Sequence, residues 1–331
     1  MMKLIKKIIY WILSVLFNLI TFLRNKFYDF GLIKSYSFEI PVISVGNLAM
    51  GGTGKTPMVE FLIKNLSDKY KIGVLSRGYK RKTNGFILAS EKDDASSIGD
   101  EPFQYYLKFK NIKIAVDKKR KRGIKKLIKI GIDIIILDDA YQHRKVIPTY
   151  SILLSDYSNL YLNDYIFPRG SLRESKTGYK RADSIIITKC PKSLSKNERK
   201  KIVNRINLKS YQHVFFSQIR YSIELISDKN KINISKLSNQ KVIVVTGIVN
   251  SENLINYLEQ KGLLINHFKY PDHYNYSKKD IFKFSGNHII TTEKDYTKLR
   301  KFNLKDLYYL PISMQIFEDE SIINLIESKI S

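Results

Sequence analysis

The chain has 331 residues, which is enough for two ordinary domains with their own hydrophobic cores. Its 57 lysine and arginine residues outnumber 31 aspartate and glutamate residues, and the formal net charge of +26 favours anionic partners such as nucleic acid, anionic lipid or phosphorylated substrates. The basic residues are spread along the chain, so a lysine-rich solvated surface explains the charge equally well. The only cysteine, Cys190, excludes an internal disulfide and a cysteine metal cluster.

The N-terminus carries a predicted apolar helix between basic residues. A helix over 8–23 would be about 24 Å long at ~1.5 Å per residue, shorter than the roughly 30 Å hydrocarbon core of a bilayer. Its polar residues recur every three or four positions and so share one helix face: Lys3, Lys7, Tyr10, Ser14, Asn18, Thr21 and Asn25. We expect a helix that lies in the interface of an anionic membrane. A short membrane span and a soluble docking helix remain open.

A glycine-rich turn is the strongest motif of the sequence. The apolar run 40–45 precedes it, and a helical pattern over 58–66 follows. A strand, a glycine-rich turn, Gly-Lys-Thr and a helix make a P-loop, whose backbone N–H groups surround phosphate oxygens. Lys55 should reach the β- and γ-phosphates of ATP, and the Thr56 hydroxyl should bind Mg²⁺. The predicted ATP-binding residues are Ala49, Met50, Gly51, Gly52, Thr53, Gly54, Lys55 and Thr56, with Ala49 standing where the strict pattern has glycine.

Two adjacent carboxylates follow the next strong apolar run. Residues 132–137 are almost all apolar, which is typical of a strand buried in a parallel sheet. Asp138 and Asp139 come directly after it. Carboxylates at the carboxyl end of a strand, downstream of a P-loop, predict a Walker B site that holds Mg²⁺ directly or through water. The alternative is a polar strand end without a metal.

Other polar residues follow predicted strands or open predicted helices. Further strands are expected at 71–76, 112–116, 151–155 and 184–188. Arg77 and Tyr79 follow the first of these, at the end of the strand where α/β sheets bind ligands. Asp100 would lie near the N-cap of a helix; capping explains it, but with Glu101 beside it the pair also permits proton transfer or metal binding. Arg173 belongs to a loop over 167–174 that could clamp a phosphate.

The second half of the chain predicts a smaller α/β domain. Strands are expected at 241–246, 265–268 and 289–292, with a helix over 251–261, and the polar stretch 220–240 is expected to hold the boundary. We therefore predict an α/β fold: a P-loop NTPase-like domain with a parallel sheet, a second, smaller α/β domain, and a membrane-associated N-terminal helix. The predicted limits are 1–30 for the helix, 31–225 for the P-loop domain and 226–331 for the smaller domain.

Seven blocks of sequence, in order, resemble the tetraacyldisaccharide 4′-kinase family, the lipid A 4′-kinases of Gram-negative envelopes. The P-loop alone is generic, but the ordered set is specific and spans nearly the whole chain. The blocks are Val45-Gly46-Asn47 with Gly51-Gly52-Thr53-Gly54-Lys55-Thr56-Pro57; Ser76-Arg77-Gly78-Tyr79; Gly99-Asp100-Glu101-Pro102; Asp138-Asp139-Ala140-Tyr141-Gln142-His143-Arg144; Leu172-Arg173-Glu174; Asp272-His273; and Thr292-Glu293-Lys294-Asp295.

The resemblance implies a reaction and a set of roles. The γ-phosphoryl group of ATP, with Mg²⁺, would pass to the 4′-hydroxyl of a lipid-linked glucosamine disaccharide 1-phosphate at the cytoplasmic face of the inner membrane. Asp100 would accept the hydroxyl proton with His273 as its partner, and closure of the two predicted domains would bring them together. The residues implied around the substrate or phosphates are Arg77, Tyr79, Glu101, Arg120, Gln142, His143, Arg173 and Glu174.

Two other classes of protein remain open beside the lipid kinase. A P-loop ATPase or GTPase that switches between partners would need no site for an acceptor sugar. A basic, nucleic-acid-binding ATPase would use the positive charge differently. The kinase interpretation predicts a lipid A precursor and an anionic membrane surface as partners and no nucleic acid, and it leaves the oligomeric state open.

Overall fold

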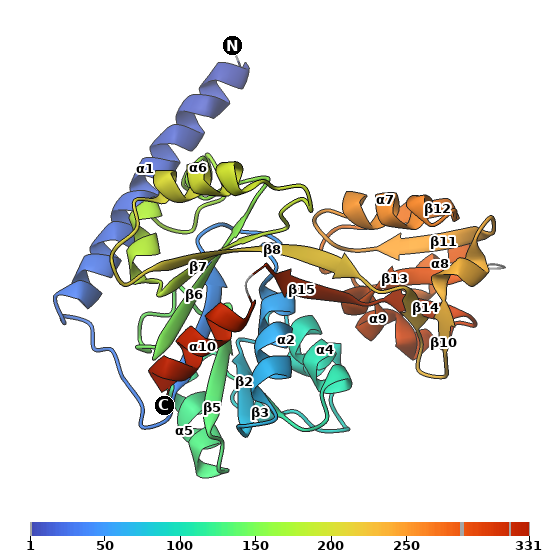
Figure 1. Ribbon diagram of the computed structural model, residues 1–331, viewed down its shortest axis with the longest axis horizontal. Coiled ribbons are helices and arrows are strands. Elements are labelled where there is room, and N and C mark those ends of the chain that lie inside the picture. Colours follow the sequence, from blue (N-terminus) through green and yellow to red (C-terminus); the bar gives the residue numbers. More distant parts are fainter. Residues whose placement is uncertain (1, 285–287, 318, 331) are drawn as a thin grey trace. The chain divides into compact units, whose positions relative to one another are not determined.

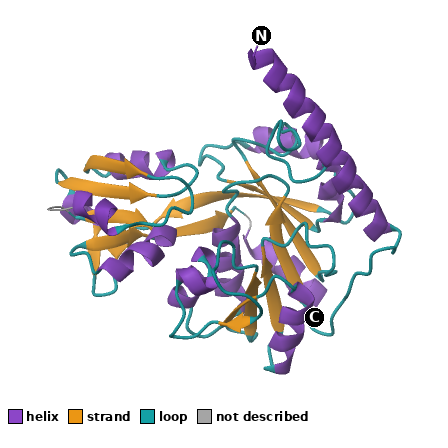
Figure 2. Cartoon of the chain, turned by 180° about the vertical axis from the view of Figure 1, so that it is seen from behind, coloured by secondary structure: helices purple, strands orange, loops and turns teal. Residues whose placement is uncertain are grey.

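The computed structural model describes residues 2–284, 288–317 and 319–330, and the chain divides into two compact units (Figure 1). The first unit comprises Met1–Arg77, Asn111–Ile219 and Met314–Ser331. The second comprises Gly78–Lys110 and Arg220–Ser313. Each unit combines helices with a β-sheet (Figure 2), so the predicted α/β class is confirmed.

A largely parallel sheet forms the centre of the first unit. Its strands follow the order β15-β8-β7-β6-β1-β5-β2-β4. They are β1 (Val42–Asn47), β2 (Ile72–Ser76), β4 (Lys113–Val116), β5 (Ile134–Asp138), β6 (Tyr150–Asp156), β7 (Ser184–Thr188), β8 (His213–Tyr221) and β15 (Ile312–Ile316). Strand β1 is wholly buried and runs parallel to β5 and β6 on its two sides. The carboxyl ends of β1 and β5 therefore meet at one edge of the sheet.

The helices of the first unit follow the expected alternation with strands. They are α1 (Met2–Asp29), α2 (Lys55–Leu66), α5 (Arg120–Lys129), α6 (Lys196–Ile206) and α10 (Asp319–Ile330), with a 3₁₀ turn η1 at Lys176–Arg181. Helix α2 buries an apolar face that includes Met58, Leu62 and Leu66. This burial stabilises the helix whose N-terminus follows the glycine-rich turn.

The second unit has its own six-stranded sheet, in the order β10-β9-β14-β13-β11-β12. Its strands are β9 (Glu224–Ile226), β10 (Lys231–Asn233), β11 (Lys241–Thr246), β12 (Leu264–Lys269), β13 (Ile289–Thr292) and β14 (Leu307–Leu310), and the short β3 (Ile87–Leu88) also belongs to this unit. Its helices are α3 (Ala95–Ile98), α4 (Asp100–Lys108), α7 (Glu252–Gln260), α8 (Lys278–Ile281) and α9 (Glu293–Leu299), with 3₁₀ turns η2 (Ile234–Leu237), η3 (Phe282–Phe284) and η4 (Arg300–Phe302). Strands β11 to β14 are parallel, and β9 and β10 extend the sheet in antiparallel fashion.

The compact units are discontinuous in sequence, whereas the predicted domains are continuous. The segment 78–110 belongs to the second unit because α4 packs against α9, and 314–331 belongs to the first. The stretch 220–240, which we expected to hold the boundary, begins where the second unit resumes at Arg220. It carries β9 and β10, which pair with each other, and β9 also pairs with β14. The predicted domain boundaries after residues 30 and 225 remain a prediction, because they concern domains that fold independently.

Helix α1 is longer than the segment predicted from its apolar residues. Its 28 residues measure about 42 Å at ~1.5 Å each, because the lysine-rich flanks continue the helix. The 25-residue stretch Ile5–Asp29 is long and apolar enough to cross a membrane, and only 11% of its most apolar window is buried. Ser14 and Thr21, from the predicted polar stripe, are buried against the protein. The polar stripe is therefore the face that packs on the first unit, and the apolar faces are the exposed ones.

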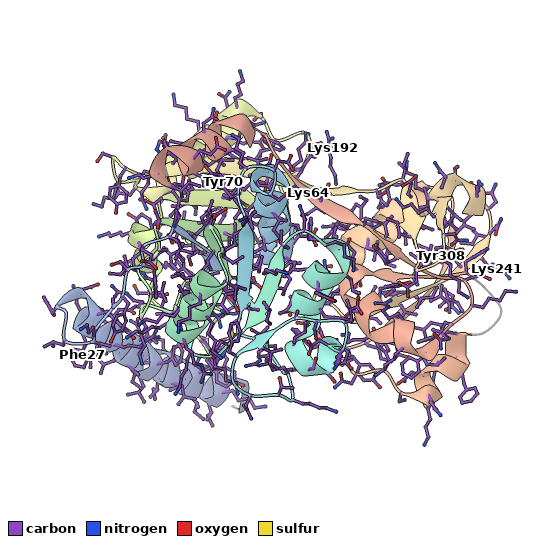
Figure 3. All side chains as sticks on the ribbon, turned by 90° about the horizontal axis from the view of Figure 1, so that it is seen from below. Phe27, Lys64, Tyr70, Lys192, Lys241 and Tyr308 are labelled. Carbon is purple, nitrogen blue, oxygen red and sulfur yellow. The ribbon has the colours of Figure 1, made fainter. Side chains whose placement is uncertain are left out.

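Lysine side chains project from many separate elements, as the even spread of basic residues along the sequence predicts. Exposed examples are Lys64 at the end of α2, Lys192 after β7 and Lys241 at the start of β11 (Figure 3). A charge distributed in this way is typical of a generally basic surface.

Candidate active site

The glycine-rich turn has the backbone geometry of a phosphate-binding loop. Gly51 and Gly54 have φ angles of 109° and 87°, in the left-handed region that favours glycine. Gly54 is the N-cap of α2, so Lys55 is the first residue of the helix and the free N–H groups of its first turn face the turn. The predicted strand, turn and helix are all present.

Neighbouring segments hold this turn in place. The Asn47 side-chain amide donates to Thr53 Oγ1 at 2.7 Å, and Thr188 Oγ1 donates to the Thr53 carbonyl at 2.9 Å. The Met50 amide donates to the Ser171 carbonyl at 2.7 Å. The turn is thus tied to β1, to β7 and to the 167–174 loop.

Lys55 and Arg173 converge on Asp139. Lys55 Nζ lies 3.6 Å from Asp139 Oδ1, and Arg173 donates to the same oxygen at 2.9 Å. Burial alone would raise the pKa of Asp139, but the charges of Lys55 and Arg173 outweigh it and the pKa lies below its ordinary value. Asp139 is therefore a carboxylate at neutral pH, and it lies at the edge of the sheet where the P-loop begins.

Asp138 and Arg120 occupy the buried side of the same edge. Arg120 is 2% exposed and donates to the Asp138 carbonyl at 3.1 Å and to the Asp117 carbonyl at 2.6 Å. Burial lowers the pKa of Arg120 to about 10, so it stays charged at neutral pH. Arg120 thus lies next to the two predicted metal carboxylates.

The described residues contain no cluster of three or more histidine, cysteine or carboxylate side chains placed to hold a metal. Mg²⁺ usually takes one or two carboxylates together with water and substrate phosphates. Asp138, Asp139 and Thr56 fit that habit, since all three lie where β5 ends or α2 begins. The metal assignment stays a prediction.

Gln142 and Glu174 form a second hydrogen-bonded group beside Asp139. Gln142 donates through Nε2 to the Asn47 carbonyl at 2.8 Å and to Glu174 Oε1 at 3.1 Å. Next to them, burial and the charges of Arg120 and other cations lower the pKa of His143 to about 4. His143 is therefore a neutral imidazole at neutral pH.

The same group is joined to α1. The buried Glu174 accepts from Asn25 of α1 at 2.7 Å and from Arg181 at 2.8 Å, and Arg144 donates to the Asn25 carbonyl at 2.7 Å. Arg24 also donates to the Gln142 carbonyl. From the sequence, Asn25 is predicted only to belong to the polar stripe of the helix. Its contact with Glu174 could not be predicted, because the two residues are 149 positions apart.

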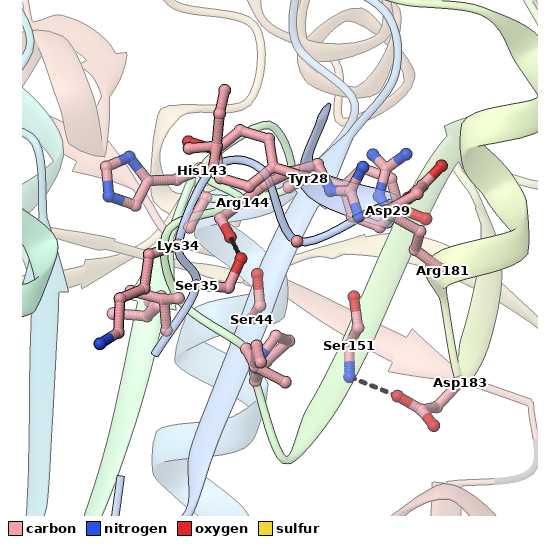
Figure 4. Close-up of a pocket in the computed structure, with 18 residues that line it drawn as sticks. Tyr28, Asp29, Lys34, Ser35, Ser44, His143, Arg144, Ser151, Arg181 and Asp183 are labelled. Atoms are coloured by element: carbon pink, nitrogen blue, oxygen red, sulfur yellow. Dashed lines mark hydrogen bonds and ion pairs between the residues drawn. The ribbon is translucent and has the colours of Figure 1, made fainter. Parts of the chain in front are cut away.

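A pocket of about 730 Å³ lies beside this network in the first unit (Figure 4). The labelled residues that line it come from the end of α1 and the segment after it, from β1 and β6, from the segment after β5, and from η1 and the residues between η1 and β7. They are Tyr28, Asp29, Lys34, Ser35, Ser44, His143, Arg144, Ser151, Arg181 and Asp183. The pocket is polar on the side of Arg144 and Arg181.

The second unit contains the predicted pair of Asp100 and His273. His273 Nδ1 lies 2.9 Å from Asp100 Oδ2, and both side chains are 13% exposed. Lys294 Nζ lies 3.0 Å from the other ring nitrogen, His273 Nε2. An ammonium group can only donate, so Nε2 accepts and the proton lies on Nδ1, from which it is donated to the Asp100 carboxylate.

The N-cap of α4 is Gly99, and no side chain caps this helix. Asp100 is the first helical residue and its carboxylate is directed to His273, so capping does not explain it. The expected domain closure is not needed either, because Asp100 and His273 belong to the same compact unit and already form a hydrogen bond.

Charged groups around Asp100 keep it ionised. Burial would raise the pKa of Asp100, but the hydrogen bond from His273 and the charges of Lys298 and Lys294 outweigh it, and the pKa is lowered. Glu101 pairs with Lys294 at 3.1 Å. The ring of Tyr79 packs edge-on against His273, with 5.1 Å between centroids.

The structure thus brings together most of the predicted site residues within two groups. Lys55, Asp139, Gln142, Arg173 and Glu174 form one network in the first unit, with Arg120, His143 and the exposed Arg77 as its electrostatic neighbours; Tyr79, Asp100, Glu101 and His273 form the other group in the second unit. Lys294, Asp295 and Lys298 also belong to the second group, although no role was predicted for them from the sequence. One sequence signal could have pointed to the two lysines: Lys294 and Lys298 are four positions apart, which places both on one face of α9.

Comparisons with known proteins agree over almost the full length of the chain. A family model described as LpxK, tetraacyldisaccharide-1-P 4′-kinase, matches residues 6–331. A curated protein of Flavobacterium johnsoniae named tetraacyldisaccharide 4′-kinase is 43% identical, over 94% of this chain and 93% of its own. One of the same name from Bacteroides thetaiotaomicron is 40% identical, over 95% of this chain and 90% of its own. The crystal structure of the "apo" form of LpxK from Aquifex aeolicus in complex with ATP superimposes with a TM-score of 0.79 at 30% identity, covering 96% of this chain and 98% of that one.

Proposed function

The chain belongs to the tetraacyldisaccharide 4′-kinase family, and from this premise we propose how its residues carry out the reaction. The protein transfers the γ-phosphoryl group of ATP to the 4′-hydroxyl of a lipid-linked glucosamine disaccharide 1-phosphate, a step of lipid A biosynthesis. ATP and Mg²⁺ are the cofactors. The hydroxyl oxygen forms a bond to the γ-phosphorus, the bond to the β–γ bridging oxygen breaks, ADP leaves, and the hydroxyl proton goes to a base.

The groups of the first unit have the phosphate-holding role. The P-loop amides and Lys55 bind the β- and γ-phosphates, because an anion at a helix N-terminus meets free N–H groups and positive partial charge. Asp138, Asp139 and Thr56 would hold Mg²⁺, which would neutralise charge on the phosphates when bound. Arg173, now paired with Asp139, supplies a cation next to that site.

The Asp100–His273 pair has the role of the base, and it is the observation that supports the kinase most. A carboxylate that accepts a hydrogen bond from a neutral histidine is ready to take a proton from a hydroxyl group. An ATPase that only switches between partners needs no such base for an alcohol acceptor. Tyr79, Glu101, Arg77, Arg120, Gln142 and His143 are proposed to contact the disaccharide or the phosphates.

Helix α1 has the role of membrane anchor. Ser14, which donates to the Ile166 carbonyl at 2.7 Å, and Asn25, which donates to Glu174, bind its polar face to the first unit over about 16 Å of helix at ~1.5 Å per residue. The apolar faces of the helix are exposed, so they can enter the interface of an anionic membrane while the polar face stays on the first unit. We therefore propose a helix that lies in the interface at the cytoplasmic face of the inner membrane.

One assay tests the proposal. Purified full-length protein, γ-labelled ATP with Mg²⁺ and a tetraacyl disaccharide 1-phosphate in mixed micelles should give a labelled lipid. The matched control is the same lipid already phosphorylated at the 4′-position, which should accept no label. ATP hydrolysis that is stimulated by nucleic acid, without label in the lipid, would favour the nucleic-acid-binding ATPase instead.

A further inference from the structure

A buried lysine and a buried aspartate lie behind the proposed base of the second unit. Lys298 is 5% exposed, and its Nζ lies 3.4 Å from Asp100 Oδ2 and 3.2 Å from Asp295 Oδ1. Neither Lys298 nor Asp295 has a part in the reaction as described so far. Two opposite charges taken out of water are destabilising unless they are well compensated, so their position beside Asp100 needs an explanation.

Asp295 is fixed by its surroundings. It is fully buried, and its Oδ2 accepts from the Gly247 amide at 2.8 Å and from Thr292 Oγ1 at 2.8 Å. The approach of Asp295 to Gly247 is so close that a Cβ at position 247 would lie 2.9 Å from Asp295 Oδ1. Asp295 therefore cannot shift without disturbing β11 and the N-cap of α9.

Lys298 is held between this fixed carboxylate and Asp100. Its ammonium also lies 5.7 Å from the centre of the buried Tyr276 ring. Asp100 Oδ2 thus receives His273 on one side and faces Lys298 on the other. His273 and Lys298 both face Oδ2, so among the described residues these two groups leave Oδ1 of Asp100 to meet an acceptor hydroxyl.

We propose that Lys298, braced by Asp295, is a positioning residue that holds the Asp100 carboxylate ionised and oriented for proton transfer. The proposal rests on the proposed function, because it gives Asp100 the part of the base. Lys298 touches neither proton donor nor phosphate in this scheme; it acts through Asp100. A purely structural ion pair between Lys298 and Asp295 would not need the third group.

Several charged and titratable groups face Asp100 and together set its electrostatic environment. They are Lys294 and Lys298 from α9, His273 and Tyr276 from the segment after β12, and Glu101 from α4 itself, with Asp295 behind Lys298 and Asp272 behind His273. Lys294 is shared with Glu101 and Asp272, at 3.1 Å from each. Lys298 is closer to Asp100 than Lys294 is, so removing its charge should raise the pKa of Asp100 more than removing the charge of Lys294 would.

The experiment measures Asp100 itself as well as the reaction. Full-length protein labelled with ¹³C-aspartate, in detergent micelles, gives the titration of the Asp100 carboxyl, identified by its loss in Asp100→Asn. The acid limb of the kcat/KM profile against pH is measured in parallel. In Lys298→Met we expect both midpoints to move to higher pH by about 1–3 units, the range by which an adjacent cation lowers an aspartate pKa. Lys298→Arg keeps the positive charge, so both midpoints should stay near their wild-type values.

Two further variants serve as controls. Lys298→Met leaves Asp295 buried without its counter-ion and could therefore unfold the protein. The double variant Lys298→Met/Asp295→Asn removes both charges, so it should fold and still show both midpoints at higher pH. Lys301→Met removes an exposed lysine from η4, which directly follows α9, and should move neither midpoint.

The positioning role of Lys298 and the kinase activity can fail independently, and the results distinguish the two cases. Folded Lys298→Met and double variants with unchanged midpoints, whatever their melting temperatures, would overturn the positioning role. A wild type that shows the Lys298-dependent carboxyl titration but labels no lipid would support the charge coupling and overturn the kinase assignment.

Discussion

Replacing Asp100 and His273, singly and together, tests whether the two act as one unit. General-base catalysis contributes ~10²–10⁴-fold, so Asp100→Asn should lower kcat by that range. His273→Ala removes one hydrogen bond to a charged group, worth about 1.5–3 kcal/mol, which corresponds to roughly 10–140-fold at ~1.4 kcal/mol per factor of ten. The smaller loss is expected because Lys298, 3.4 Å away, still faces the carboxylate in that variant. The double variant should be no slower than Asp100→Asn alone.

The assay is phosphate transfer to the disaccharide lipid, with ATP affinity measured separately. Affinity for ATP should be unchanged, since neither residue belongs to the P-loop. Asp94→Ala is the matched control: Asp94 caps α3 through the Ser96 and Ser97 amides. That variant should lose about 1 kcal/mol of stability and keep its turnover. Losses of Asp100→Asn and His273→Ala that multiply fully in the double variant would refute the shared role.

Further predictions concern the phosphate site, the metal, the anchor and pH. Lys55→Ala should abolish transfer in the lipid assay, and near-normal turnover would remove the P-loop from the mechanism. Asp138→Asn and Asp139→Asn should each slow the reaction, with a higher Mg²⁺ requirement for whichever binds the ion; normal Mg²⁺ dependence in both would contradict the metal site. In vesicle flotation, 1 M salt should release only part of the protein, because lysine contacts are screened but apolar burial is not; complete release would exclude an apolar anchor. His143 has a pKa of about 4 when folded, below its ordinary value, so it binds fewer protons than in the unfolded chain between about pH 4 and 6.5. Wild type should therefore lose about 1–2 kcal/mol of stability relative to His143→Gln as pH falls through that window, after allowance for partial solvent screening, in urea melts; equal losses in both proteins would contradict the burial of a neutral imidazole.

Local sequence patterns determined the elements of the first unit. The apolar runs at 71–76 and 132–137 became β2 and β5, and the glycine-rich turn joined β1 to α2. Such patterns suffice because a parallel strand buried on both faces needs a continuous apolar run, and a phosphate-binding turn needs glycines at particular backbone angles. The ordered motifs also identified the family, which the comparisons confirm.

Contacts between distant segments were decided only by the tertiary structure. The stretch 220–240 is polar and its strands are short, yet β9 pairs with β14 and β10 pairs with β9, so both extend the sheet of the second unit. Asp100 joined the second unit because α4 packs on α9, a contact that no local pattern encodes.

The electrostatic environment of the base is the clearest case. Lys298 and Asp100 are far apart in sequence, and a lysine on a short helix is ordinarily solvated. Burial turned it into a counter-ion 3.4 Å from Asp100, braced by Asp295. The sequence supplied the residue types for phosphoryl transfer, but charge effects depend on distance and burial, and only the folded chain sets those.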